Sequence, residues 1–259
     1  MGYSRNDRLY KEYRKLWFDN PRDCVYQDFP LRLEIDLTQK AVFLDETLYD
    51  LIIQESKRYG LYSLKFGVRN EPLLHDQAVE FIKIAKDAGI TEVILDTNGE
   101  RLDATIIQDI INARLDQIEI TASVATQPII DSLLLLRKFR RNHTPQIIVK
   151  MTTEVRDWDT VADQLMLTPS YDYRDKTVDE AVKKPDCPFL YQKLVVLPNG
   201  DVVPCEFALS SVLGNISQMP IHSLWDGDEM VRLRLLTSNK ADICLRCPRR
   251  RLQQGQKII

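Results

Sequence analysis

Residues 92–123 have the sequence EVILDTNGERLDATIIQDIINARLDQIEITAS, in which two strand patterns flank one helix pattern. The apolar runs at 92–97 and 117–123 are rich in β-branched residues and predict strands. Between them, Asp103 is suited to the N-cap of a helix, and four isoleucines follow it at helical spacing. The segment therefore predicts one β/α/β unit.

The same alternation extends in both directions from this segment. Strand patterns occupy residues 31–38, 63–68 and 146–153, and helix patterns occupy residues 44–60, 75–89 and 128–142. Residues 158–170 add a shorter, sixth helix–strand unit. Regular alternation with continuous apolar strands predicts a parallel sheet covered by helices. We therefore expect an α/β fold built as a partial (β/α)6 barrel.

Polar residues gather where three of these strands end. Arg69, Asn70 and Glu71 follow the second strand, Thr97 and Asn98 follow the third, and Ser123 ends the fourth. In a parallel β/α barrel the carboxyl ends of the strands meet on one face, where functional residues collect. Taken alone the pattern is a weak indication, because many α/β proteins have polar loops there.

Four of the five cysteines lie in the last third of the chain. They are Cys187, Cys205, Cys244 and Cys247, and the last two form a CxxC pair. In a reducing cytosol such clustering favours metal ligation over disulfides. Cys24 stands apart from them, and we interpret it as a packed or incidental thiol.

The first two clustered cysteines bracket a predicted β-hairpin in residues 193–205, KLVVLPNGDVVPC. Asn199 and Gly200 supply the positive φ angles of a tight turn. Four thiolates suit either a tetrahedral zinc ion or a 4Fe–4S cluster. The spacing of the cysteines does not choose between the two.

The C-terminal residues resemble the auxiliary-cluster domain, of the SPASM or twitch kind, of radical S-adenosylmethionine (SAM) enzymes. The similarity consists of Cys187-x12-Gly200-x4-Cys205, the loop Leu213-Gly214-Asn215-Ile216, a helix with Ile221, Leu224, Trp225 and Arg232, and the closing CxxC. Because no further cysteine follows Cys247, the shorter twitch arrangement with one auxiliary 4Fe–4S cluster fits better. We expect a small α+β hairpin-plus-helix cluster domain here.

The barrel residues resemble the same family. Glu71 and Pro72 match the GGEP segment that lies against the amino group of SAM, although Arg69 and Asn70 stand where glycines are usual. Thr97-Asn98-Gly99 matches the TNG that follows strand three, and Ser123 matches a strand-end serine that faces SAM. The resemblance thus implies a SAM site at Arg69, Asn70, Glu71, Pro72, Thr97, Asn98 and Ser123.

The resemblance also implies an organisation and an activity. We expect an N-terminal extension at 1–30, a radical SAM partial barrel at 31–173 and the auxiliary-cluster domain at 174–259. Enzymes of this family cleave SAM to a 5′-deoxyadenosyl radical that abstracts hydrogen from a substrate. With the auxiliary cluster in electron transfer, the expected reaction is dehydrogenation or epimerisation of a small-molecule, sugar or peptide substrate. A flavodoxin- or ferredoxin-type protein would supply electrons.

One motif of the family is missing. The CxxxCxxC that should follow strand one, and hold the radical-generating cluster, is absent between Lys40 and Leu44. Either residues are omitted after Lys40, in which case a second 4Fe–4S cluster belongs there, or the chain is a degenerate, non-catalytic barrel acting as a binding or partner subunit. We favour omission, because the loops after strands one, four and five all look shortened on one face. The two alternatives differ in the gene, because the enzyme needs a CxxxCxxC there and the partner subunit lacks it.

Composition sets the remaining expectations. The chain has 259 residues, 44% of them hydrophobic and 28% charged, and a net charge of −3. This balance suits a soluble globular protein, and it gives no electrostatic reason to expect binding to nucleic acid or to a membrane. The N-terminus is too polar for a signal peptide, so we expect a cytoplasmic protein.

Overall fold

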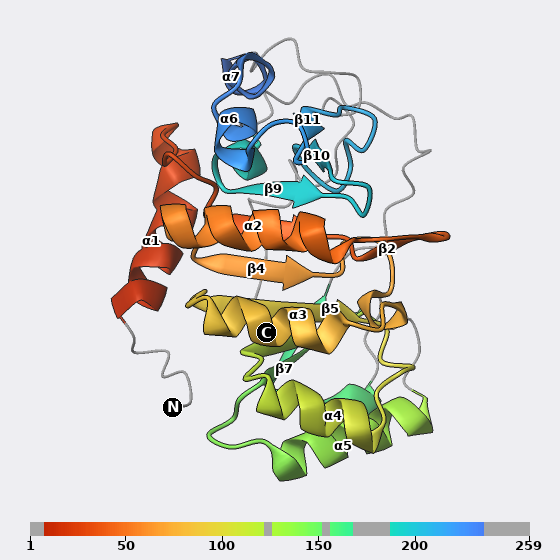
Figure 1. Ribbon diagram of the computed structural model, residues 1–259. Coiled ribbons are helices and arrows are strands. Elements are labelled where there is room, and N and C mark those ends of the chain that lie inside the picture. Colours follow the sequence, from red (N-terminus) through yellow and green to blue (C-terminus); the bar gives the residue numbers. More distant parts are fainter. Residues whose placement is uncertain (1–7, 122–125, 152–155, 168–186, 236–259) are drawn as a thin grey trace, which may run out of the picture.

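The computed structural model describes residues 8–121, 126–151, 156–167 and 187–235. These residues form a nine-stranded sheet in the order β11-β10-β9-β1-β4-β5-β6-β7-β8, together with a two-stranded hairpin of β2 and β3. Figure 1 shows helices α2 to α5 along one face of the sheet. The architecture is the open, partial barrel that the β/α alternation predicts.

Seven neighbouring strands of the sheet are parallel. They are β1 (Arg32–Ile35), β4 (Ser63–Phe66), β5 (Glu92–Thr97), β6 (Gln117–Thr121), β7 (Gln146–Met151), β8 (Gln164–Leu167) and β9 (Lys193–Val196). Because these strands are parallel, all their carboxyl ends meet at one edge of the sheet, the right-hand edge in Figure 1.

Capping residues define where helices between these strands begin or end. They are α2 (Glu46–Tyr59), α3 (Ala78–Asp87), α4 (Ala104–Asn112) and α5 (Gln127–Phe139). The predicted N-cap is confirmed, because the Asp103 side chain accepts a hydrogen bond from Ile106 N. Gly60 ends α2 in the left-handed conformation, at φ 69°.

The sixth helix–strand unit is only partly formed. Strand β8 is present, but the residues before it form a short 3₁₀ turn, η2 (Arg156–Thr160), in place of a helix. Trp158 and Val161 are fully buried within this short connection. The prediction of a sixth helix over these residues is wrong, because they form a single 3₁₀ turn.

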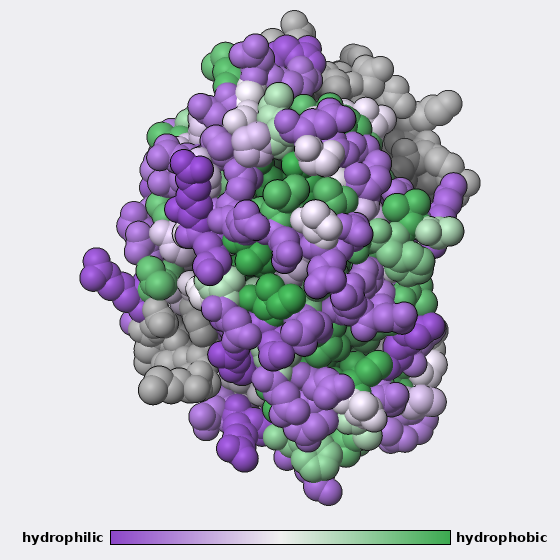
Figure 2. All heavy atoms as spheres, in the orientation of Figure 1, coloured by the Kyte–Doolittle hydropathy of each residue, from purple (hydrophilic) through white to green (hydrophobic). Residues whose placement is uncertain are grey.

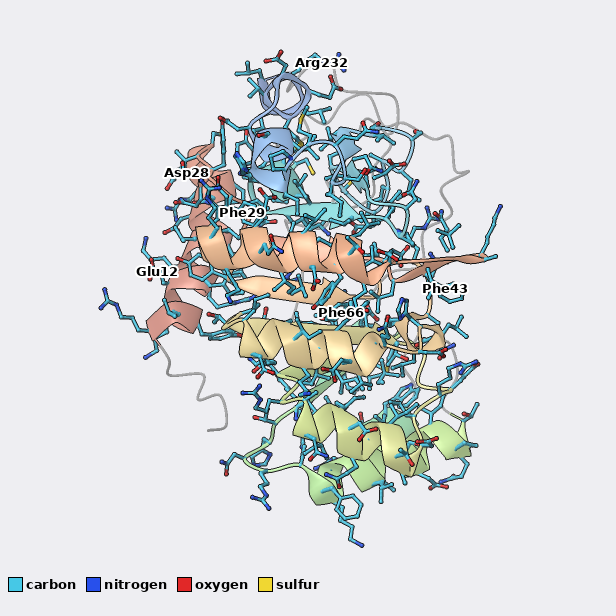
Figure 3. The ribbon with its side chains drawn as sticks, viewed as in Figure 1. Glu12, Asp28, Phe29, Phe43, Phe66 and Arg232 are labelled. Atoms are coloured by element: carbon cyan, nitrogen blue, oxygen red, sulfur yellow. The ribbon has the colours of Figure 1, made fainter. Side chains whose placement is uncertain are left out.

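The apolar core lies between the helices and the sheet. Phe66, labelled at the centre of Figure 3, is completely buried at the end of β4. The Tyr49 ring of α2 stacks on Phe81 of α3 at 4.1 Å, and its hydroxyl donates to the Phe81 carbonyl oxygen at 2.6 Å. Each such buried side chain stabilises the fold by roughly 1.5–3 kcal/mol.

The opposite face of the sheet is lined with charges, although strands buried in parallel sheets are normally apolar on both faces. We call the following set the charged face: Arg32, Glu34, Lys65, Glu92, Asp96, Glu119, Lys150 and Lys193. Lys65 Nζ lies 2.8 Å from both Asp96 and Glu119, and Lys150 contacts the same two carboxylates. These ion pairs connect strands β4 to β7.

The predicted C-terminal hairpin is confirmed. Strand β10 (Asp201–Val203) runs antiparallel to β9, with Val202 opposite Val196, and Gly200 occupies the turn at φ 85°. Strand β11 (Gly214–Asn215) extends the sheet, and helices α6 (Ile221–Trp225) and α7 (Asp228–Leu235) follow. Because β9 pairs with β1, this segment continues the barrel sheet, and a domain division at 173/174 stays a prediction.

The N-terminal helix α1 (Arg8–Asp23) is tied to the C-terminal segment. Gln192 Nε2 donates to the Trp17 carbonyl oxygen at 2.5 Å, and Trp225 Nε1 donates to the Gln27 carbonyl oxygen at 2.8 Å. The described part of the predicted extension, from residue 8 on, therefore packs on residues more than a hundred positions away in the sequence.

The helix-covered surface is mainly hydrophilic, with scattered apolar residues between the charged ones (Figure 2). Within the described ranges, no helix is long and apolar enough to cross a membrane.

Candidate functional site

Asp36, directly after β1, organises the loop that follows β4. Its carboxylate is 2% exposed and accepts weak hydrogen bonds from the backbone N–H groups of Val68, Arg69 and Asn70, at 3.3–3.4 Å. It also accepts a stronger bond from the Asn70 side chain at 2.7 Å. Burial outweighs these donors and raises the pKa of Asp36 above its ordinary value.

Glu71 joins that loop to the end of β5. Its carboxylate accepts hydrogen bonds from Thr97 Oγ1 and Asn98 N, both at 2.8 Å, and from Leu73 N at 3.0 Å. The Glu71 carbonyl oxygen accepts from Thr38 Oγ1 at 3.2 Å. Glu71 therefore ties the loop after β4 to the end of β5 and to Thr38. Its carboxylate already accepts hydrogen bonds from protein donors.

The loop can approach β5 because Gly67 has no side chain. Gly67 has φ +87°, and a Cβ added there would lie 2.2 Å from the Asp96 carbonyl oxygen. Only glycine tolerates both the positive φ and this contact. This requirement for glycine at position 67 sets the point where β4 ends and the following loop begins.

The structure brings together most of the residues predicted to bind SAM. Arg69, Asn70, Glu71, Pro72, Thr97 and Asn98 all lie at the carboxyl edge, on the ends of β4 and β5. Arg69 is exposed, whereas Pro72 and Thr97 are buried. Ser123 lies outside the described residues, so its placement is not tested.

The end of β1 closes in a tight hairpin. Thr38 of β2 (Thr38–Gln39) pairs with Phe43 of β3 (Val42–Phe43), and Lys40 turns the chain at φ 57°. Lys40 and Ala41 form the turn of this hairpin, and the omission of residues after Lys40 stays a prediction. The hairpin points away from the sheet, as the Phe43 label in Figure 3 shows.

The residues at this position do not fit a radical-generating cluster. Between Asp36 and Asp45 the chain has no cysteine, and a cubane cluster with one open iron needs three thiolates. Instead, Val42 and Phe43 present half-exposed apolar side chains, and the Phe43 ring packs on the edge of His75.

The described part of the C-terminal cysteine set does fit a cluster. Cys187 begins the 3₁₀ turn η3 (Pro188–Tyr191) and is 8% exposed, and Cys205 follows β10. Burial, Glu206 and Cys187 all raise the pKa of the Cys205 thiol, so the two thiols lie within electrostatic reach of one another. The Phe207 N–H donates to the Cys205 sulfur, as donors around iron–sulfur ligands do.

Cys244 and Cys247 lie outside the described residues. Within the described ranges, no group of three or more Cys, His, Asp or Glu side chains is placed to hold a metal ion. Cys24 is exposed, and its sulfur lies 3.9 Å from the Pro21 carbonyl oxygen, which agrees with an incidental thiol.

Sequence reasoning missed Asp36 and the charged face. A signal was present, because Arg32, Glu34 and Asp36 alternate with apolar residues along one strand. The same alternation is typical of a strand with one face in water, so the pattern alone does not place these charges in a sheet interior.

The comparisons with known proteins agree with this geometry. Residues 187–248 match the family model of the SPASM iron–sulfur cluster-binding domain. No curated protein matches the sequence. The fold is similar to BtrN in an open conformation, at 16% identity and TM-score 0.60 over 85% of this chain and 92% of BtrN.

Two ligand-bound structures are similar to the same extent. BtrN in complex with AdoMet and 2-DOIA has 15% identity and TM-score 0.61, over 81% of this chain and 87% of that one. SuiB of Streptococcus suis bound to S-adenosylmethionine has 12% identity and TM-score 0.63, over 92% of this chain and 73% of SuiB.

Proposed function

We propose, from the radical SAM fold and the SPASM-type segment that this chain carries, that it binds S-adenosylmethionine and a C-terminal 4Fe–4S cluster and acts in a radical oxidoreductase or epimerase reaction. The radical-generating cluster is a second 4Fe–4S cluster, on a CxxxCxxC loop omitted after Lys40. The observation that supports this most directly is the SPASM match over the segment that holds the buried Cys187 and the partly buried Cys205.

The proposed cluster ligands are Cys187, Cys205, Cys244 and Cys247. A cluster held by four protein thiolates has no open iron for a substrate, so its chemistry when bound is the transfer of single electrons. That role suits a reaction in which a substrate radical must lose or gain an electron, as dehydrogenation and epimerisation require.

The proposed SAM site is the carboxyl edge of β4, β5 and β6. BtrN and SuiB both have structures with SAM bound. In this chain Glu71 would act by holding the loop, because its carboxylate is engaged by Thr97 and Asn98. The exposed Arg69 would face the carboxylate of SAM, and Asn70, Pro72 and Ser123 would line the same edge.

The β2–β3 hairpin supplies none of the thiolates that a radical-generating cluster needs, so the residues at this strand end cannot cleave SAM by themselves. That observation supports a second candidate function. In it the chain is a non-catalytic partner subunit that keeps the barrel and the C-terminal cluster and works with another protein.

Substrate and partners follow the proposed class. SuiB has been solved with a precursor peptide and BtrN with 2-DOIA, so both peptide and small-molecule substrates occur on this fold. For this chain we propose a small-molecule, sugar or peptide substrate and a flavodoxin- or ferredoxin-type electron donor. A cytoplasmic location is part of the proposal.

One set of measurements on anaerobically reconstituted protein, made from the complete gene, separates the two candidates. Iron and sulfide would be counted, SAM binding measured by equilibrium dialysis, and 5′-deoxyadenosine assayed after reduction with dithionite. About eight irons per chain with 5′-deoxyadenosine formation supports the enzyme. About four irons without it supports the partner subunit, and a chain with no iron and no SAM binding refutes both.

A further inference from the structure

Lys193 is a buried cation within the segment that matches the cluster-binding domain. It begins β9, and its side chain lies on the charged face with the residue 3% exposed. Its ammonium donates to Glu34 at 2.7 Å and to Glu206 at 2.8 Å. The Phe189 ring covers it with its centroid 4.0 Å from Nζ. Two carboxylates and one aromatic ring thus fix the charge in position.

This cation lies near the two described thiols. In the sequence, Cys187 leads through η3 into β9, and Glu206 directly follows Cys205. Lys193 Nζ lies 2.8 Å from the carboxylate of Glu206, the neighbour of Cys205, and 4.0 Å from the ring centroid of Phe189, two residues after Cys187. The ammonium is therefore held against both cysteine segments, and its charge is opposite in sign to that of Glu206.

Burial would normally discharge such a lysine. Here Glu206 and Glu34 together outweigh the effect of burial and raise the pKa of Lys193. The ammonium consequently stays charged at neutral pH. A fixed charge in a protein interior is screened far less than one on the surface.

We propose that Lys193 sets the reduction potential of the cluster held by Cys187 and Cys205, by stabilising its reduced state. The inference rests on the proposed function, because it needs a cluster on these thiols. Reduction adds one negative charge to the cluster, and a nearby fixed cation lowers the energy of that state. Glu206 acts in the opposite direction. Lys193 is thus a positioning and tuning residue, and it touches no substrate.

Lys65 provides a matched control on the same face of the sheet. It is also buried and also held by two carboxylates, Asp96 and Glu119, each at 2.8 Å. Strand β1 separates β4, which carries Lys65, from β9. Removing the charge of Lys65 should perturb the sheet to a similar degree, but at a position farther from the thiols.

The test is a potentiometric titration, followed by electron paramagnetic resonance, of the full chain with its cluster reconstituted. At the potential where the wild-type cluster is half reduced, Lys193→Gln should lower the ratio of reduced to oxidised cluster about tenfold. That ratio corresponds to a potential lower by about 59 mV for a one-electron couple. Glu206→Gln should shift the potential upward, Lys193→Arg should keep it, and Lys65→Gln should leave it unchanged.

The proposal is overturned if Lys193→Gln leaves the potential unchanged, or if Lys65→Gln shifts it equally. Should Lys193→Gln fail to fold because Glu34 loses its partner, the double variant Lys193→Gln/Glu34→Gln removes the unpaired carboxylate. Glu206→Gln is an independent test, because an unchanged or lower reduction potential of its cluster contradicts the proposal. A wild-type chain that takes up no iron would refute the proposed function, whereas an unshifted potential in a loaded cluster refutes this inference alone.

Discussion

The hydrogen bond between Glu71 and Thr97 offers a quantitative test of how the strand-end site is held together. Glu71 accepts three hydrogen bonds, from Thr97 Oγ1, Asn98 N and Leu73 N. Each bond to a charged acceptor contributes roughly 1.5–3 kcal/mol when buried, and Glu71 is only half-buried. We therefore expect Glu71→Ala to lower the free energy of unfolding by about 2–4 kcal/mol.

Thr97→Val removes the hydroxyl donor and keeps the shape of the side chain. It should cost about 1–2 kcal/mol, because Thr97 Oγ1 also accepts from Gly99 N at 3.1 Å. If Glu71 acts through Thr97, the two changes share one interaction. The double variant should then be more stable than the sum of the single losses predicts, by about 1 kcal/mol.

The assay is urea unfolding followed by circular dichroism, with SAM affinity measured by equilibrium dialysis on the same four proteins. Glu71→Ala should weaken SAM binding roughly tenfold, because the 69–71 loop loses its anchor. Glu100→Ala is the control, since exposed Glu100 accepts only a 3.2 Å bond from the Asn98 side chain and should cost less than about 0.5 kcal/mol. Additive losses for Glu71 and Thr97, with unchanged SAM affinity, would refute the reasoning.

Three further predictions concern single positions. Gly67→Ala should destabilise the chain by about 3 kcal/mol or more in urea unfolding, because the new Cβ meets the Asp96 carbonyl oxygen at 2.2 Å and the residue keeps a positive φ; a variant of wild-type stability would contradict this. Cys205→Ser should abolish the C-terminal cluster in iron and sulfide analysis, whereas Cys24→Ser should load normally; equal loading of both variants would remove Cys205 from the ligand set. Because burial raises the pKa of Asp36 above 3.8, its protonation stabilises the folded chain at low pH, and that contribution is lost as the pH rises through the raised value. As the pH rises from acidic to neutral, the free energy of unfolding of Asp36→Asn should therefore increase relative to that of the wild type. A difference between the two proteins that does not change with pH would show that the pKa is not raised.

The sequence predicted the elements whose signals are local. Asp103 and Gly60 cap their helices as expected, because a cap depends on a few neighbouring residues. The hairpin around Gly200 formed for the same reason. The predicted sixth helix is a 3₁₀ turn instead, after which Val161 is buried beside Trp158, a packing that no local signal encodes.

The hairpin at Lys40 was missed because its turn has neither Gly nor Asn at the positive-φ position. The sequence therefore predicted one continuous strand over residues 31–38, where the structure has β1 and the separate strand β2. Thr38 of β2 pairs with Phe43 of β3, so the chain turns back after Lys40.

For the site, the sequence by itself determined which residues lie at the carboxyl edge, since in a parallel sheet that follows from the order of strands and loops. The sequence also showed that two thiols, Cys187 and Cys205, flank the predicted hairpin. Only the tertiary structure decided what these residues contact. Glu71 reaches Thr97, and Lys193 reaches Glu34, which lies 159 positions earlier in the chain. Such pairs form only when the sheet aligns distant strands, so no periodicity within one segment encodes them.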